Sequence, residues 1–250
     1  MVRALMIDFS KIFGTRRIYL CMLGVTVVCS IAYFEMLSGL KFYGDVENGF
    51  INLLGSEIIL FCFLISIAGG SFLYCTEEKH GYLFFEIQRV GSKNYVISKL
   101  ISAEISGFTI VFSGLLFALG IMFVFLASSY QELGIKVISI VILKKLLWQI
   151  VMFAMLCGFL SVLGFLVTTF YAKYYVGLTT PILIYYAVLS LSIWLPIPDS
   201  LLVSKVFLSA LWVDSGFGKI FIYALLYTTC LSVVFYKIAK RNVQRRVEHV

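Results

Sequence analysis

Six apolar stretches, each long enough to cross a lipid bilayer, constrain the fold of this chain more than any other feature. A membrane-spanning helix needs about 20 mostly apolar residues. The stretches lie at about 18–37, 56–75, 100–128, 146–170, 176–195 and 219–236. Only 13% of the residues are charged and 61% are hydrophobic, whereas an ordinary soluble domain is about 25% charged. The sequence therefore predicts an all-α membrane protein with six transmembrane helices.

The connections between these stretches are short, and none is rich in Gly and Ser or in Pro. No internal repeat and no low-complexity tract interrupts the chain. We therefore expect residues 1–250 to form a single polytopic transmembrane domain without a sizeable soluble module.

The positions of Lys and Arg predict how the chain is oriented. If the N-terminus is cytoplasmic, 14 of the 20 Lys and Arg residues fall in inner segments and 6 fall in outer segments. Cytoplasmic loops carry an excess of these residues, which favours both termini inside. The net charge of +7 is then an orientation signal, and no nucleic-acid partner is expected.

The first residues of the chain have the pattern of an amphipathic helix. Over residues 2–13 the apolar positions fall on one face: Val2, Leu5, Met6, Phe9, Ile12 and Phe13. Such a helix can lie in the headgroup plane before the chain turns inward at Arg16 and Arg17. The alternative is a signal peptide, with small residues at Ser30 and Ala32. Because the apolar run continues past that site, an uncleaved first span is favoured.

The segment 76–99, TEEKHGYLFFEIQRVGSKNYVISK, is the longest polar and basic stretch in the first half of the chain. Within it Leu83, Ile87 and Val90 recur at helical spacing, which predicts a short amphipathic helix over 82–90. Glu86 and Arg89 fall on its more polar face. Gly91 suits the left-handed position after a helix end, and Ser92 can cap the next helix. The alternative is a plain connecting loop that happens to contain a helix.

Three features bear on a pathway through the membrane. Pro181 lies inside the fifth span, where it removes a backbone donor and is expected to kink the helix. Glu57 lies at the outer end of the second span, either facing a substrate cavity or as an ordinary interface carboxylate. The segment 196–217 is too apolar for a free loop. It is either re-entrant or an interfacial helix with Trp212 in the aromatic belt.

Small residues recur at four-residue spacing within the spans and permit close approach of helices. The pairs are Ala103 and Gly107, Gly114 and Ala118, and Ala154 and Gly158. The six cysteines fall in or at the ends of spans without a C-x-x-C pair, so we interpret them as small buried hydrophobes. Neither a disulfide framework nor a metal site is expected.

Several functions are disfavoured by what the sequence lacks. No span contains a histidine, which argues against an intramembrane Ser–His protease, and we predict no catalytic residue. No ionisable residue falls at the middle of a span, which argues against an ion-coupled transporter. Gly218-Lys219 lacks the earlier glycine and the following Ser or Thr of a phosphate-binding loop. The chain is therefore not expected to bind a cofactor or to hydrolyse ATP itself.

Six spans with both ends inside, an amphipathic N-terminal helix and a basic first cytoplasmic loop resemble the permease subunit of ABC-2-type exporters. The likeness is sharpest in the segment 76–99. There an acidic residue, Glu77 or Glu78, is followed by Gly81, the short helix, the sequence Gly91-Ser92-Lys93 and then Lys99. Many members carry Pro near Val90 and Arg at the position of Lys93, so this chain departs from the pattern at two points.

The resemblance implies that residues 82–90 form a coupling helix that docks on a separate ATPase subunit, and that residues 2–13 form an elbow helix. The residues implied in coupling are Glu78, Gly81, Leu83, Phe84, Glu86, Ile87, Arg89 and Lys93. The working transporter would contain two such permeases, identical or homologous, and two ATPase subunits that bind ATP and Mg²⁺. It would lie in a bacterial cytoplasmic membrane.

The cargo implied is amphipathic or lipophilic, because no charge is available to line a pathway. Export of an antimicrobial peptide or bacteriocin, or self-immunity against one, is the cargo assignment that the family suggests. One alternative is a membrane immunity or scaffold protein that sequesters a peptide without transporting it. A secondary transporter is a further alternative, but it should show polar or charged groups at mid-membrane depth.

Overall fold

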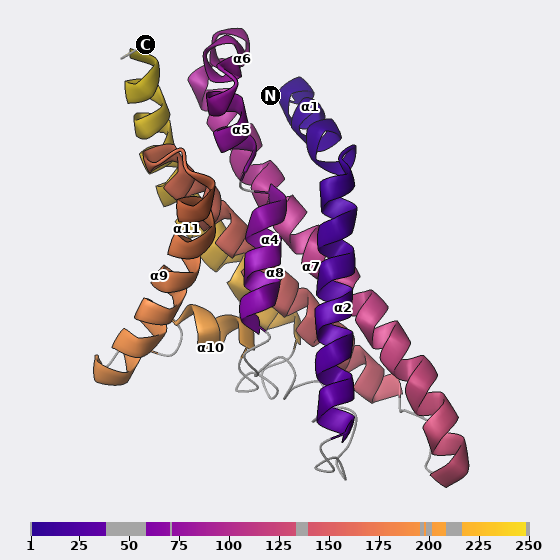
Figure 1. Ribbon diagram of the computed structural model, residues 1–250. Helices are drawn as coiled ribbons and strands as arrows, with labels where there is room; N and C mark the ends of the chain where they lie inside the picture. Colours follow the sequence, from indigo (N-terminus) through magenta and orange to yellow (C-terminus); the bar gives the residue numbers. More distant parts are fainter. Residues whose placement is uncertain are drawn as a thin grey trace.

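A computed structural model describes residues 2–38, 59–70, 72–133, 140–195, 198, 202–208 and 217–248. Within these ranges all regular secondary structure is helical, as the composition predicts (Figure 1). The helices are α1 (Val2–Phe13), α2 (Arg16–Ser38), α4 (Ile59–Gly70), α5 (Leu73–Lys79), α6 (Tyr82–Val90), α7 (Ser92–Leu133), α8 (Ile140–Phe170), α9 (Tyr174–Trp194), α10 (Val203–Leu208) and α11 (Phe217–Glu248).

Five helices in the described part of the chain are long and apolar enough to cross a membrane, namely α2, α7, α8, α9 and α11. This makes the chain a multi-pass membrane protein. Several helices extend past the apolar stretches that mark them in the sequence. The 42-residue α7 begins at Ser92, eight residues before its stretch, and α11 continues twelve residues beyond position 236.

The predicted second span, 56–75, is not one continuous helix. Residues 56–58 lie outside the described residues, α4 ends at Gly70, and α5 begins at Leu73. The break follows Gly69 and Gly70, and glycine is the weakest helix former after proline. Gly70 also lies against α7, where a Cβ atom would sit 2.0 Å from Ser106 Oγ.

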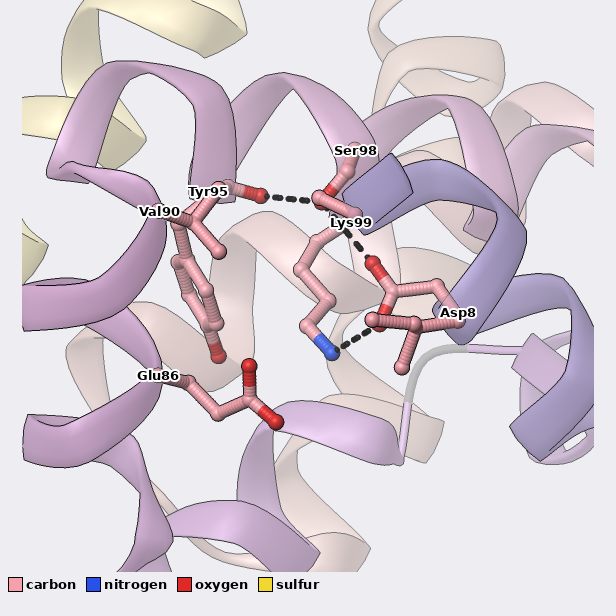
Figure 2. Close-up of a pocket in the computed structure, with 8 residues that line it drawn as sticks. Asp8, Glu86, Val90, Tyr95, Ser98 and Lys99 are labelled. Atoms are coloured by element: carbon pink, nitrogen blue, oxygen red, sulfur yellow. Dashed lines mark hydrogen bonds and ion pairs between the residues drawn. The ribbon is translucent and has the colours of Figure 1, made fainter. Parts of the chain in front are cut away.

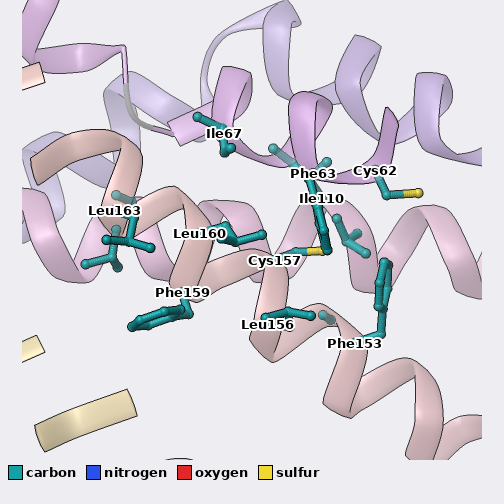
Figure 3. Close-up of a cluster of buried hydrophobic side chains, with 14 of the residues drawn as sticks. Cys62, Phe63, Ile67, Ile110, Phe153, Leu156, Cys157, Phe159, Leu160 and Leu163 are labelled. Atoms are coloured by element: carbon teal, nitrogen blue, oxygen red, sulfur yellow. The ribbon is translucent and has the colours of Figure 1, made fainter. Parts of the chain in front are cut away.

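The core of the bundle is α8. Every residue from Leu156 to Leu166 is buried, because α8 contacts α4, α7, α9, α10 and α11. Figure 3 shows apolar side chains of α4, α7 and α8 meeting in this core. The ring of Phe63 on α4 stacks on Phe153 of α8 at 5.9 Å and meets Tyr185 of α9 edge-on at 5.1 Å. One α4 ring thus fixes both α8 and α9.

Small residues lie at the closest helix crossings, as their spacing predicts. A Cβ atom on Gly107 of α7 would lie 2.2 Å from Ser161 Oγ of α8, and one on Gly158 of α8 would lie 2.8 Å from the Glu104 carbonyl of α7. A Cβ atom on Gly114 of α7 would lie 2.6 Å from Val25 Cβ of α2. Each of these glycines lets two backbones approach closely.

The cysteines are free thiols, and four of the six are buried. Cys230 on α11 is exposed, so the interpretation as a buried hydrophobe is wrong for it, whereas Cys21 on α2 is half-buried and packs against the core. In the core, Cys29 Sγ of α2 lies 3.8 Å from Cys62 Sγ of α4. The two thiols pack where the first and second apolar stretches meet.

Both chain ends lie at the end of the bundle that carries α5 and α6, and α10 lies toward the opposite end (Figure 1). Contacts between distant segments agree with this arrangement. Thr76 of α5 and Tyr174 of α9 approach within 3.3 Å through their hydroxyl groups, and Gln244 of α11 donates to Ser92 of α7 at 3.4 Å. The segments richest in Lys and Arg are therefore gathered at one end.

Candidate functional site

The most distinctive local structure at this end is the short helix α6, which spans Tyr82–Val90 as the sequence predicts. A glycine with positive φ stands at each end, Gly81 at 70° and Gly91 at 82°. The Gly91 N–H donates to the Ile87 carbonyl at 2.8 Å and closes the last turn. Because other residues are strained at positive φ, both positions favour glycine. The chain thus reverses sharply on both sides of nine helical residues.

The two faces of α6 have different surroundings. Leu83 and Ile87 are buried, at 9% and 7% exposed. On the outer side Tyr82 is 61% exposed and Phe85 is 67% exposed, and Phe84 is partly exposed. The buried pair fixes the helix to the bundle, while the outer aromatic side chains have no covering element in the described part of the chain.

Beneath α6 lies a buried charge cluster centred on Lys99 of α7, which is 3% exposed. Its ammonium group lies 2.7 Å from Asp8 Oδ1 on α1 and 2.6 Å from Glu77 Oε1 on α5. In Figure 2 the side chains of Lys99 and Asp8 point toward each other from separate helices. A single cation therefore joins α1, α5 and α7.

Further contacts extend this cluster to α6. Lys11 of α1 lies 3.0 Å from Glu77 Oε1 and 3.1 Å from Glu86 Oε1, so it bridges α5 and α6. The Tyr95 hydroxyl donates to Glu77 Oε2 at 2.7 Å, and the Ser98 hydroxyl donates to Asp8 Oδ2 at 2.8 Å. Buried ions are tolerated only when such hydrogen bonds satisfy their remaining atoms.

A small pocket, just large enough for a water molecule, lies between α1, α6 and α7 (Figure 2). Its lining residues are Ala4, Ile7, Asp8, Glu86, Val90, Tyr95, Ser98 and Lys99. The pocket shows that the three helices meet through polar side chains rather than through a continuous apolar seam. The described residues contain no group of His, Cys, Asp or Glu side chains that could hold a metal ion.

The position of α1 explains how Asp8 enters the cluster. The helix spans Val2–Phe13 as predicted, but only one edge of its apolar face, at Ile12, is fully buried against the bundle. Asp8 and Ile12 are buried, at 4% and 3% exposed, whereas Met6 is 65% exposed. The side of α1 that carries Asp8 and Lys11 contacts the neighbouring helices, which leaves much of the apolar face uncovered.

The environment of Glu77 shifts its pKa below the ordinary value for a glutamate. Burial alone would raise the pKa of this carboxyl group. The opposing effects outweigh burial: the Lys99 ammonium with its hydrogen bond, the Tyr95 hydroxyl and the Lys11 ammonium all favour the carboxylate. The interactions with Glu77 thus depend on its negative charge.

This shift predicts how the stability contributed by Glu77 varies with pH. Because its folded-state pKa is lower than the unfolded value of about 4.3, the contribution is fully present above that value. It is lost as the pH falls through the folded-state pKa. We expect the difference in Tm between the wild type and Glu77→Gln to be largest near pH 7 and to shrink below about pH 4. Thermal unfolding in detergent across this range measures it, and a difference that grows on acidification would contradict the assignment.

The residues predicted to act in coupling fall in different places. Gly81, Leu83, Phe84, Ile87 and Arg89 belong to α6 or to its start, and Lys93 is exposed just after it. Glu86 is not on a free polar face, because its side chain is 23% exposed and is held by Lys11. Glu78 turns away from α6 and pairs with Arg246 of α11.

Of the predicted pathway residues, Glu57 and Trp212 lie outside the described residues. Pro181 is buried within α9, which runs unbroken from Tyr174 to Trp194. It shares the packed face of α9 with Gly177 and Tyr185. The segment 196–217 contains the short helix α10, and Leu202, Val206 and Phe207 beside or within it are buried.

The centre of the cluster was missed by reasoning from sequence patterns. Asp8, Lys11, Tyr95 and Ser98 were not proposed as site residues, and Lys99 entered only as a basic residue at the start of a span. For Asp8, the sequence signal is a charged residue within an apolar stretch, between Ile7 and Phe9. Such a charge requires a partner when it is buried.

Comparisons with protein-family models, with curated proteins and with solved structures find no match to this chain. The functional argument therefore rests on the geometry of α6 and of the charge cluster beneath it.

Proposed function

We propose that this chain is the membrane-embedded permease subunit of an ABC-2-type exporter, and that α6 is its coupling helix. The observation that carries the proposal is the pair of faces on α6. Its outer face presents Tyr82, Phe84 and Phe85 to solvent. Its inner side is tied to α1 by the Lys11–Glu86 ion pair and packs on α5 and α7. A short helix held in this way can pass a push on its outer face to several transmembrane helices as a rigid body.

The remaining parts of the proposal follow from the same arrangement. Residues 56–75, which include α4, form the second of six spans, and α1 is the elbow helix, with its apolar face in the lipid headgroup region. Both termini and α6 lie in the cytoplasm of a bacterium, where Lys and Arg are enriched. ATP and Mg²⁺ bind to a separate ATPase subunit, and two permeases with two ATPases form the transporter.

The proposed cargo is amphipathic or lipophilic, and an antimicrobial peptide is the cargo class we favour. The described spans present mostly apolar, Ser, Thr and Tyr side chains, and the buried ion pairs lie at one end of the bundle. Export or self-immunity would both move such a molecule out of the membrane or the cytoplasm.

Phe85→Asp tests the coupling helix directly. We expect the reconstituted protein to lose at least about thirtyfold in affinity for an ABC ATPase that binds the wild type, because an exposed aromatic anchor contributes about 2 kcal/mol or more at an interface. ATP hydrolysis stimulated by the membrane protein should fall with it. The measurement is a binding titration in nanodiscs with the purified ATPase.

Tyr171→Asp is the matched control, since Tyr171 is 64% exposed at the same end of the bundle but lies outside α6. It should leave the affinity unchanged. Equal affinities for wild type and Phe85→Asp, or the absence of any ATPase that binds the wild type, would contradict the proposal. The second result would favour a protein that sequesters a peptide without transporting it.

A further inference from the structure

The last twelve residues of α11, Lys237–Glu248, continue the helix beyond its apolar stretch. We term these residues the α11 extension. Eighteen positions separate Lys219 from Lys237, which is about 27 Å along a helix and close to the hydrocarbon thickness of a bilayer. The charged residues after Lys237 therefore lie outside the hydrocarbon core. α11 remains helical through Glu248.

The α11 extension is docked against both flanks of α6. Ala239 and Val243 are fully buried, and Asn242 donates to Thr169 of α8 at 3.3 Å. Arg246 pairs with Glu78, just before α6, and donates to the Phe170 carbonyl at 2.6 Å. Gln244 donates to Ser92, just after α6. The extension and α6 are thus neighbours on one surface.

At this end of the molecule, acidic side chains are paired within the protein, whereas several basic side chains are exposed. Every acidic side chain that the structure describes in α1, α5 and α6 is engaged by a basic residue within the protein: Asp8 and Glu77 by Lys99, Glu86 by Lys11, and Glu78 by Arg246. Several other basic side chains at this end face outward. The exposed ones around α6 and on the α11 extension are Lys79, Arg89, Lys93, Lys237, Arg241 and Arg245.

On the extension, Lys237, Arg241 and Arg245 are spaced at i, i+4 and i+8 and form one exposed stripe, opposite the buried face of Ala239 and Val243. Their distances from the membrane differ. Arg241 lies about 6 Å and Arg245 about 12 Å beyond Lys237 along the helix, whereas a headgroup layer is about 5–8 Å thick. Arg241 therefore lies near the outer edge of the headgroups, and Arg245 lies beyond them, at the level of a cytosolic protein.

We propose that Arg241 and Arg245 form a second docking surface, next to α6, for an acidic face of the ATPase subunit. This inference rests on the proposed function, because it assigns the partner to the same protein. An ATPase seated on the aromatic face of α6 would lie beside the basic stripe, since Arg246 and Gln244 hold the extension to both flanks of α6. The charge contact would speed association and fix the orientation of the partner.

The test compares charge-reversed proteins in nanodiscs of phosphatidylcholine alone. Arg241→Glu/Arg245→Glu should weaken binding of the purified ATPase about tenfold or more, and should flatten the salt dependence of its association rate. Arg241→Gln/Arg245→Gln, which removes the charge without reversing it, should give a smaller loss of the same kind. Arg246 remains unchanged in all variants, so the extension keeps its own contacts.

The matched control is Lys173→Glu/Lys237→Glu, which reverses two exposed charges at the membrane surface and should alter affinity less than twofold. If both Arg241/Arg245 variants bind like wild type while Phe85→Asp does not bind, the inference is wrong and the proposed function stands. If the loss occurs only when phosphatidylglycerol is added to the nanodiscs, the stripe binds lipid, which also overturns the inference. If no ATPase binds the wild type, both proposals fail.

Discussion

Lys99→Met is expected to lower the free energy of unfolding by about 3–5 kcal/mol, the usual cost of removing one partner from a buried ion pair. The Lys99 side chain is 3% exposed and lies within 2.7 Å of both Asp8 and Glu77. Without its ammonium group, two carboxylates are left in a buried site. Lys11 reaches only Glu77 of this pair, so Asp8 keeps no ion pair with the described residues. Thermal unfolding in detergent, followed by a thiol-reactive dye or by size-exclusion chromatography after heating, measures the loss.

Lys93→Met is the control for Lys99→Met, because Lys93 is exposed on the same helix and no ion pair to it is found among the described residues. Its effect should stay within about 0.5 kcal/mol. A triple variant, Asp8→Asn/Glu77→Gln/Lys99→Met, should recover much of the stability, since replacing a whole buried ionic group is far less costly than breaking it. A Lys99→Met protein as stable as wild type would show that the cluster is not closed as described.

Gly107→Leu is expected to cost about 3 kcal/mol or more, or to prevent the bundle from assembling. A Cβ atom at this position would lie 2.2 Å from Ser161 Oγ, 2.8 Å from Ser161 Cβ and 3.1 Å from the Cys157 carbonyl oxygen. Ser161 cannot simply rotate away without loss, because its hydroxyl donates to the Ser66 carbonyl at 2.9 Å. A leucine would therefore push α7 and α8 apart at the centre of the bundle.

Gly120→Leu tests whether the effect belongs to this crossing. Gly120 lies on the same helix, but a Cβ atom there would meet nothing within 4 Å, so we expect no loss of stability. Adding Ser161→Gly to Gly107→Leu should restore part of the stability, because it removes the two atoms that clash most. The yield of monodisperse protein and the Tm in detergent separate these outcomes. Equal behaviour of the two leucine variants would argue against close packing of α7 on α8.

Local signals in the sequence predicted α1 and α6 closely. The bounds of α6 followed from Gly81 and Gly91, whose freedom at positive φ stops a helix within one residue, and from the spacing of Leu83 and Ile87. At these two turns glycine is favoured because it adopts the backbone conformation at positive φ without strain. The all-helical membrane fold followed in the same way, because the length of an apolar stretch is a local property.

The features missed depend on contacts between distant residues. Asp8 and Lys99 are 91 positions apart, and the helical wheel of α1 shows which face is apolar without showing which face packs. The break before α5 depends on how closely Gly70 approaches α7. The α11 extension was missed because its apolar stretch ends near position 236, although Lys, Arg and Gln are good helix formers and no Pro or Gly follows.

Lys99 also determines when the end of the bundle that carries α1 and α6 can assemble during synthesis. α1 leaves the ribosome before α7, and the cation that holds Asp8 is translated 91 residues later, which corresponds to about 5–18 s at ordinary elongation rates. Until α7 has been inserted, the N-terminal helix has no site to occupy and must wait at the membrane surface. Arg246, near the end of the chain, is added later still. Although α1 is translated before the other described helices, it is therefore among the last of them to reach its native position.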